Sequence, residues 1–164
     1  MAGMRFLIAA IALAGMFVSV LALRVHNADP GAAPPCAVDE HWDCGAVNHS
    51  RFAVFPPSSF DEDPKSAKVH IPVAVIGIAG YGAMLVLALL GRFWIVLQLS
   101  EIGFAAACML TYLEAFVIQK WCIYCVWSQG IVTTLMLATI AALLMRRRSG
   151  RVLAMPAPAA NRVV

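Results

Sequence analysis

Four long apolar runs constrain the fold of this chain more than any other feature of its sequence. They comprise residues 6–23, 71–90, 93–118 and 123–145. A helix needs about 20 apolar residues to cross a hydrocarbon core of ~30 Å, and a helix satisfies its own backbone hydrogen bonds there. Since 62% of the residues are hydrophobic and only 13% are charged, we expect an all-α integral membrane protein that forms a bundle of four transmembrane helices.

The predicted bundle is a single membrane domain, residues 1–148, with a long first loop at residues 24–70. The loop has Pro-rich ends, which indicate turns, and a central part predicted to hold short helical or irregular segments capped by Asp43 or Asn48. We expect residues 149–164 to be a disordered cytoplasmic tail. The first apolar run is longer than the apolar region of a signal peptide, about 7 to 15 residues, so we expect it to be retained as a helix.

Basic residues near the helix ends predict the orientation, because the cytoplasmic ends of membrane helices carry an excess of Lys and Arg. They are Arg5, Arg92, Arg146, Arg147, Arg148 and Arg151. The first loop instead has more acidic than basic residues. We therefore expect both termini on the cytoplasmic side of the inner (cytoplasmic) membrane, and the first loop and the turn before the fourth helix outside. The net charge of +3 does not indicate a nucleic-acid site, since the basic residues follow this membrane pattern.

Four of the five cysteines fall on the predicted outer side. Cys36 and Cys44 lie in the first loop, whereas Cys122 and Cys125 form a Cys-x-x-Cys motif at the start of the fourth helix. A helix N-terminus stabilises a thiolate, so Cys122 is the better-placed nucleophile, and Cys125 is expected to face into the bundle. A mobile dithiol beside a fixed one can pass electrons through mixed disulfides. The fifth cysteine, Cys108, is expected to be a small buried hydrophobic residue.

Two other interpretations remain open from these residues. The chain can be a non-enzymatic membrane module in which the cysteines form structural disulfides, or the four thiolates can bind zinc. A bridge between Cys122 and Cys125 would restrict the unfolded chain little, because the loop that it closes is short. Oxidising surroundings disfavour zinc, and we expect no metal.

The ordered set of motifs resembles the vitamin K epoxide reductase family, in particular its bacterial members. The matching features are the spacing of Cys36 and Cys44, the segment DCGAVNHS, the segment IPVAVIGIAGY and the segment YLEAFVIQKWCIYCVWS. The resemblance implies a membrane thiol:quinone oxidoreductase that generates disulfides. Electrons would enter at Cys36 from a thioredoxin-fold partner of the DsbA type, pass from Cys44 to Cys122, and leave from Cys125 to ubiquinone or menaquinone. Because the chain ends soon after the fourth helix, we expect the partner to be a separate protein.

The resemblance also implies that Ser50 and Asn48 line the quinone pocket. Ionisable groups at membrane depth are functional candidates, and Glu114 lies near the outer end of the third helix, where protons for a quinone are needed. Glu101, deeper in the same helix, can reach the surface or pair inside the bundle. Tyr81 in the second helix can hydrogen-bond a ligand carbonyl or serve in helix packing.

Two positions depart from the animal members of that family. The animal members hold the vitamin K head group with a tyrosine and an asparagine. This chain has Gln129 and Val73 at those positions. We therefore expect the substrate to be a plain quinone rather than vitamin K epoxide.

Overall fold

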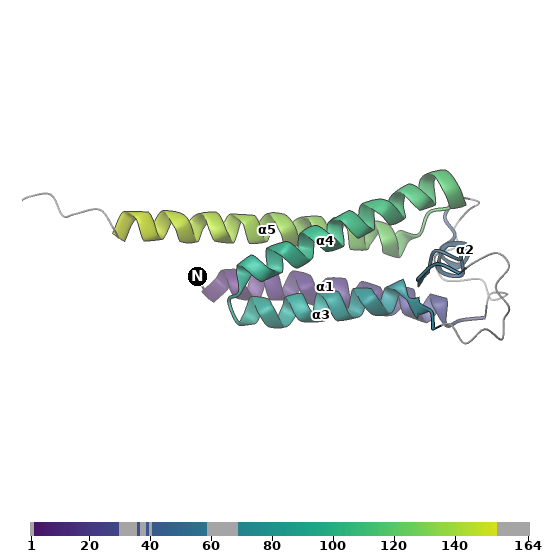
Figure 1. Cartoon of the computed structure of the whole chain (residues 1–164), viewed down its shortest axis with the longest axis horizontal. Helices are drawn as coiled ribbons and strands as arrows, with labels where there is room; N and C mark the ends of the chain where they lie inside the picture. Colours follow the sequence, from purple (N-terminus) through teal and green to yellow (C-terminus); the bar gives the residue numbers. More distant parts are fainter. Residues whose placement is uncertain (1, 30–35, 37–38, 40, 59–68, 154–164) are drawn as a thin grey trace, which may run out of the picture.

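A computed structural model describes residues 2–29, 36, 39, 41–58 and 69–153 of the chain. In this part of the chain, four long helices run side by side (Figure 1): α1 (Ala2–His26), α3 (Val73–Leu89), α4 (Phe93–Tyr112) and α5 (Ile123–Leu153). α4 continues into a π-helical turn, η1 (Leu113–Ile118). The connection between α1 and α3 contains the short helix α2 (Cys44–Asn48) and the antiparallel strands β1 (Val54–Phe55) and β2 (Ile71–Pro72).

Three of the described helical segments are long and apolar enough to cross a membrane, namely Gly3–His26, Phe93–Ile118 and Ile123–Arg148. These findings support a helical membrane protein. α3 is also apolar, but its 17 residues make it shorter than these three.

Three of the predicted helices differ in their bounds from the structure. The first was expected over residues 6–23 and spans Ala2–His26. The second apolar run was expected to be helical from residue 71, but Ile71 and Pro72 form strand β2 and pair with Phe55 and Val54. Pro72 is extended, with φ −55° and ψ 132°, so the helix begins only after it. The fourth helix was expected to end at residue 145, whereas α5 continues to residue 153, since its arginines favour a helix and no proline follows them before Pro156. Residues 154–164 of the predicted tail lie outside the described residues.

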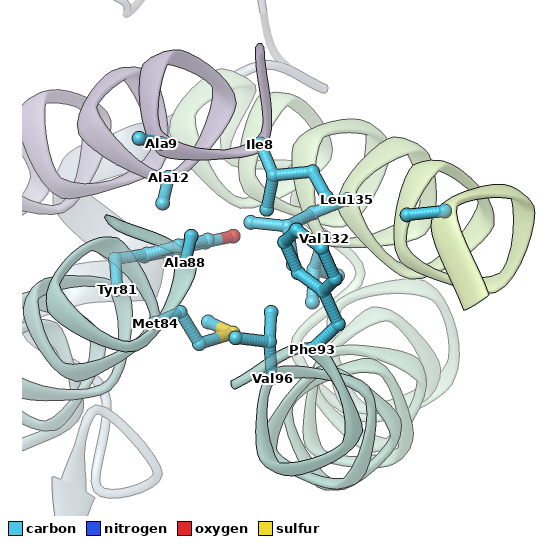
Figure 2. Close-up of a cluster of buried hydrophobic side chains, with 11 residues drawn as sticks. Ile8, Ala9, Ala12, Tyr81, Met84, Ala88, Phe93, Val96, Val132 and Leu135 are labelled. Carbon is cyan, nitrogen blue, oxygen red and sulfur yellow. The ribbon is translucent and has the colours of Figure 1, made fainter. Parts of the chain in front are cut away.

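A core cluster of apolar side chains joins the four long helices, which point these side chains toward one another (Figure 2). Ile8 of α1 and Leu135 of α5 are fully buried, as is Val96 of α4. The helices α1 and α3 can pack closely because Gly15 leaves room for the ring of Tyr81, which a Cβ at that position would overlap. The buried members of the core cluster are Ile8, Ala9, Ala12, Tyr81, Met84, Ala88, Phe93, Val96, Val132, Leu135 and Ala142.

The two ends of the bundle differ in charge and structure. At the end that holds the N-terminus, Gly91 turns the chain from α3 into α4 with φ +73°, and Arg146 Nη1 donates a hydrogen bond to the Gly91 carbonyl oxygen at 3.3 Å. The helix α2 lies at the other end (Figure 1). The bundle thus separates an arginine-rich end from the end where the cysteines gather.

Candidate functional site

The first loop is joined to the start of α5 by a short backbone pairing. Trp42 and Trp121 form a parallel bridge, in which the Asp43 N–H donates to the Trp121 carbonyl oxygen at 3.0 Å and the Trp121 N–H donates to the His41 carbonyl oxygen at 2.8 Å. The two indole rings lie 6.3 Å apart. Since Cys122 follows Trp121 directly, this pairing brings the Cys44 region beside the Cys-x-x-Cys motif.

Two aspartates shape the loop around Cys44. Asp39 Oδ1 accepts hydrogen bonds from the N–H groups of His41 at 2.7 Å and Trp42 at 3.0 Å. The Trp42 and His41 N–H groups hold the pKa of the Asp39 carboxyl below its ordinary value. Asp43 is the N-cap of α2, because its Oδ1 accepts the Ala46 N–H at 2.9 Å. The expected cap at Asp43 is therefore confirmed, whereas Asn48 is the last residue of α2 and not a cap.

The two cysteine pairs share one buried cluster. Cys36 and Cys44 form a disulfide with a Cα–Cα distance of 5.8 Å, while Cys122 and Cys125 are free thiols. Cys44 and Cys122 are fully buried. In this oxidised state Cys36 and Cys44 offer no thiolates as ligands. We call this set the cysteine cluster; it comprises Val25, Cys36, Cys44, Val47 and Cys122, with Ile118, Tyr124 and Cys125 packed against it.

The Cys122 thiol has surroundings that favour its ionised form. A hydrogen bond from the Cys125 thiol lowers the pKa of Cys122, and backbone N–H groups of Cys125 and Tyr124 act in the same direction, whereas burial and the nearby Glu114 carboxylate raise it. Asn48 Nδ2 lies 3.4 Å from Cys122 Sγ and also donates to the Cys44 carbonyl oxygen at 2.9 Å. Asn48 thus connects the helix that carries Cys44 to the sulfur of Cys122.

A cavity of about 380 Å³ lies between the helices next to Cys125. Its walls are mostly apolar side chains and glycines, which come from α1, the α2 region, α3, α4 with η1, and α5. A few polar residues are placed among them: Ser19, His26, Asn48, Ser50, Tyr81, Glu114, Tyr124, Cys125 and Ser128. Ser50 Oγ is buried and has no hydrogen-bond partner among the described residues. An apolar cavity with a few polar groups and an unpaired hydroxyl fits a flat ligand that carries carbonyl oxygens.

Glu114 reaches the cavity from the π-helical turn η1. Only 2% of its surface is exposed, and its Oε2 accepts the Cys122 N–H at 3.2 Å. Its Oε1 has no hydrogen-bond partner in the described part of the chain. η1 ends at Ile118, and the left-handed conformation of the next residue, Gln119, φ 58°, turns the chain back toward Cys122. Single turns of π-helix occur frequently at functional sites.

The structure brings together the residues that the sequence singled out as candidates. Asn48, Ser50, Tyr81 and Glu114 all line the cavity with Cys125. Tyr81 also serves in helix packing, since its hydroxyl donates to the Ser128 carbonyl oxygen at 3.0 Å.

Four other residues were discussed from the sequence, namely Glu101, Cys108, Val73 and Gln129. Glu101 is exposed on α4, away from the cavity-lining side chains. Cys108 was expected to be buried but is exposed, and Nε2 of Gln129 on α5 lies 3.4 Å from its sulfur. Val73 lines the cavity, whereas Gln129 does not.

Sequence reasoning missed His26. It lines the cavity, its Nδ1 lies 2.6 Å from the Asn48 carbonyl oxygen, and its ring stacks on His49 at 6.1 Å. His49 in turn lies 3.1 Å from the Ala28 carbonyl oxygen through Nε2. The sequence offered one signal for His26: it lies just after the first apolar run and before the part of the loop that carries Cys36 and Cys44.

The family model described as the vitamin K epoxide reductase family matches residues 6–140, which include both cysteine pairs. The chain belongs to the vitamin K epoxide reductase family. No match was found among proteins of curated function. The vitamin K epoxide reductase family is one of membrane oxidoreductases that act on disulfides, use quinones and work with thioredoxin-like partners. The resemblance inferred from the sequence motifs is thus confirmed at the level of the family.

Proposed function

We propose that this protein is a membrane thiol:quinone oxidoreductase that generates disulfides in a thioredoxin-fold partner. The observation that carries the proposal is the position of the cysteine cluster: an oxidised pair, Cys36 and Cys44, and a reduced pair, Cys122 and Cys125, are packed together at the edge of a cavity that Cys125 lines. A disulfide and a dithiol that are packed together can exchange electrons, and the cavity offers room for an electron acceptor.

In this proposal α3 also crosses the membrane, as the second of four transmembrane helices, and residues 1–148 form one membrane domain. At 1.5 Å per residue, the 17 residues of α3 span about 25 Å, and a bilayer accommodates such a short span by local thinning. The arginine-rich end faces the cytoplasm with both termini, and the cysteine cluster lies at the extracytoplasmic side of the inner membrane.

Electrons move through the cysteines by thiol–disulfide exchange. A thiolate of the partner attacks Cys36, and a second partner thiolate resolves the mixed disulfide, which leaves the partner oxidised and Cys36 and Cys44 reduced. The Cys44 thiolate then attacks Cys122 in an inner disulfide, Cys125 leaves as the thiolate, and Cys36 attacks Cys44 to release Cys122. The described arrangement, with an outer disulfide and an inner dithiol, is the state that follows this transfer.

The cavity residues are the proposed quinone site. A bound ubiquinone or menaquinone accepts two electrons and two protons from the inner dithiol. Ser50 and Asn48 would donate hydrogen bonds to carbonyl oxygens, Tyr81 would shape the inner wall, and Glu114 would contact the ring region near Cys125. Because Val73 and Gln129 replace the polar residues that hold the vitamin K head group in animal members, the proposed substrate is the quinone and not the epoxide.

The proposal is tested with the full-length protein in detergent, a reduced thioredoxin-fold donor and a soluble quinone. The wild type should oxidise the donor and reduce an equal amount of quinone, and Cys125→Ala should reduce quinone no faster than a sample without protein. Cys108→Ala is the matched control, since Cys108 is exposed on another helix, and it should retain the wild-type rate. If the wild type transfers no electrons to quinone from any dithiol, the cysteines are structural bridges and the proposal fails.

A further inference from the structure

One buried group in the cavity has an unused hydrogen-bonding atom beside the reacting sulfurs. Glu114 is 98% buried, since only 2% of its surface is exposed. Its Oε1 has no hydrogen-bond partner among the described residues. Burial of an unpaired carboxylate oxygen is costly, and a packed bundle retains such a group where it serves a ligand or a reaction.

The contacts of Glu114 involve both sulfur-bearing residues of the inner pair. Oε2 accepts the backbone N–H of Cys122 at 3.2 Å, across the turn between η1 and α5. The carboxyl group lines the same cavity as the Cys125 thiol and interacts with it electrostatically. Oε2 thus positions Cys122, and the Glu114 carboxyl group lies beside the Cys125 thiol, which must lose its proton when the disulfide forms.

Among the described residues that line the cavity, Glu114 is the only carboxyl group. The other titratable side chains there are His26 on α1, Tyr81 on α3 and Tyr124 and Cys125 on α5. The Tyr81 hydroxyl already donates a hydrogen bond to the Ser128 carbonyl oxygen, and His26 Nδ1 is paired with the Asn48 carbonyl oxygen. Glu114 is therefore the group with both a free acceptor atom and a contact to the reacting thiol.

We propose that Glu114 is a catalytic residue that takes the proton of the Cys125 thiol when the inner disulfide forms and passes it to the reduced electron acceptor. This inference rests on the proposed function. In the overall step the S–H bonds of Cys122 and Cys125 break and their S–S bond forms. Two electrons and two protons reach the quinone, which becomes the hydroquinone; one proton travels through the Glu114 carboxylate, and the Cys122 thiol supplies the other. Glu114 ends the step as the carboxylate from which it began.

The same position permits a purely structural role, in which Glu114 only accepts the Cys122 N–H. Two substitutions separate the roles. Glu114→Gln keeps the length of the side chain and an oxygen that can accept this N–H but cannot carry a proton at neutral pH. Glu114→Asp keeps the carboxyl group on a shorter side chain. A structural role makes glutamine the better substitute, whereas proton transfer makes aspartate the better one.

The experiment measures quinone reduction with each variant of the full-length protein, with Glu101→Gln as the control because Glu101 is exposed on α4. We expect Glu114→Gln to lower kcat by about 10²- to 10⁴-fold at an unchanged KM for quinone, as for loss of a general base, and Glu114→Asp to retain more activity than Glu114→Gln. A Glu114→Gln enzyme within about twofold of the wild type, or one more active than Glu114→Asp, would overturn the inference.

A second readout needs no quinone. Infrared difference spectra between the dithiol and disulfide forms, produced with a small dithiol and a small disulfide, should contain a shifted carboxylate band from Glu114, because its neighbours Cys122 and Cys125 are thiols in one form and a disulfide in the other. The band should be missing in Glu114→Gln and present in Glu101→Gln; its persistence in Glu114→Gln would exclude the assignment. If Cys125→Ala lacks turnover while Glu114→Gln retains it, the proposed function stands and only this inference falls. If the wild type itself reduces no quinone, the proposed function falls.

Discussion

The same four helices form a close-packed core at one level of the bundle and enclose a cavity at another. In the core cluster, Ile8, Val96 and Leu135 have no exposed surface. Toward α2, small residues such as Gly80 and Gly103 replace such side chains on the inner faces, and a space of about 380 Å³ remains. Tyr81 belongs to both regions, since it is part of the core cluster and lines the cavity. The comparison suggests that the core cluster supplies stability and that the cavity is kept for a ligand.

The largest expected effect concerns stability. Leu135→Ala should lower the free energy of unfolding by about 2–4 kcal/mol, because a fully buried leucine leaves a void in the core cluster. Denaturant titration of the detergent-solubilised protein measures this change. Leu137→Ala on the same helix is the control, since Leu137 is 58% exposed, and it should cost less than about 1 kcal/mol. Equal losses in the two variants would show that the core cluster is not the stabilising region.

The second effect concerns the cavity and should leave stability almost unchanged. A Cβ at Gly80 would meet no atom within 4 Å, so a leucine there would extend into the cavity without a clash. Gly80→Leu should raise the KM for quinone by at least about tenfold. Gly130→Leu serves as the matched control, because Gly130 has equally open surroundings and does not line this cavity. Steady-state kinetics with a soluble quinone decides, and equal KM values in both variants would mean that quinone binds elsewhere.

The smallest effect concerns the contact between the α2 region and Cys122. Asn48→Ala removes the N–H donor 3.4 Å from Cys122 Sγ. Because that donor favours the ionised sulfur, its loss should raise the pKa of Cys122, so that less thiolate exists at any pH below the new value. Exchange between the two cysteine pairs should slow by at most about tenfold. The ultraviolet absorbance of the thiolate, followed against pH in a Cys108→Ser, Cys125→Ser background, measures the shift.

Asn27→Ala is the control for this titration, since Asn27 is exposed and is not part of the cysteine cluster. It should leave the titration of Cys122 unchanged. A Cys122 titration that is the same in Asn48→Ala and in the parent protein would mean that the Asn48 contact has no electrostatic consequence.

The helical membrane character and the family were predictable from the sequence because each rests on local signals. Apolar length indicates helices that can cross a bilayer, and the third predicted run, residues 93–118, coincides with α4 and η1. Cys125 was likewise expected to face into the bundle from its place one turn into a helix, and it lines the cavity.

Other features depend on contacts between distant residues and could not be predicted in this way. The bridge between Trp42 and Trp121 joins two segments far apart in the chain. His26 looked like the polar end of an apolar run, and only the fold of the α2 region places it on the cavity wall. Cys108 was wrongly expected to be buried, because an apolar sequence does not reveal which face of a membrane helix contacts lipid.

The central claim is that electrons pass between Cys44 and Cys122. The most direct test uses the full-length protein with Cys36, Cys108 and Cys125 all replaced by alanine, so that Cys44 and Cys122 are the only thiols left. After mild oxidation in detergent, peptide mapping under non-reducing conditions identifies the bonded cysteines. The relay predicts a disulfide between Cys44 and Cys122 within one chain. Two free thiols after oxidation, in a protein that remains folded, would contradict it.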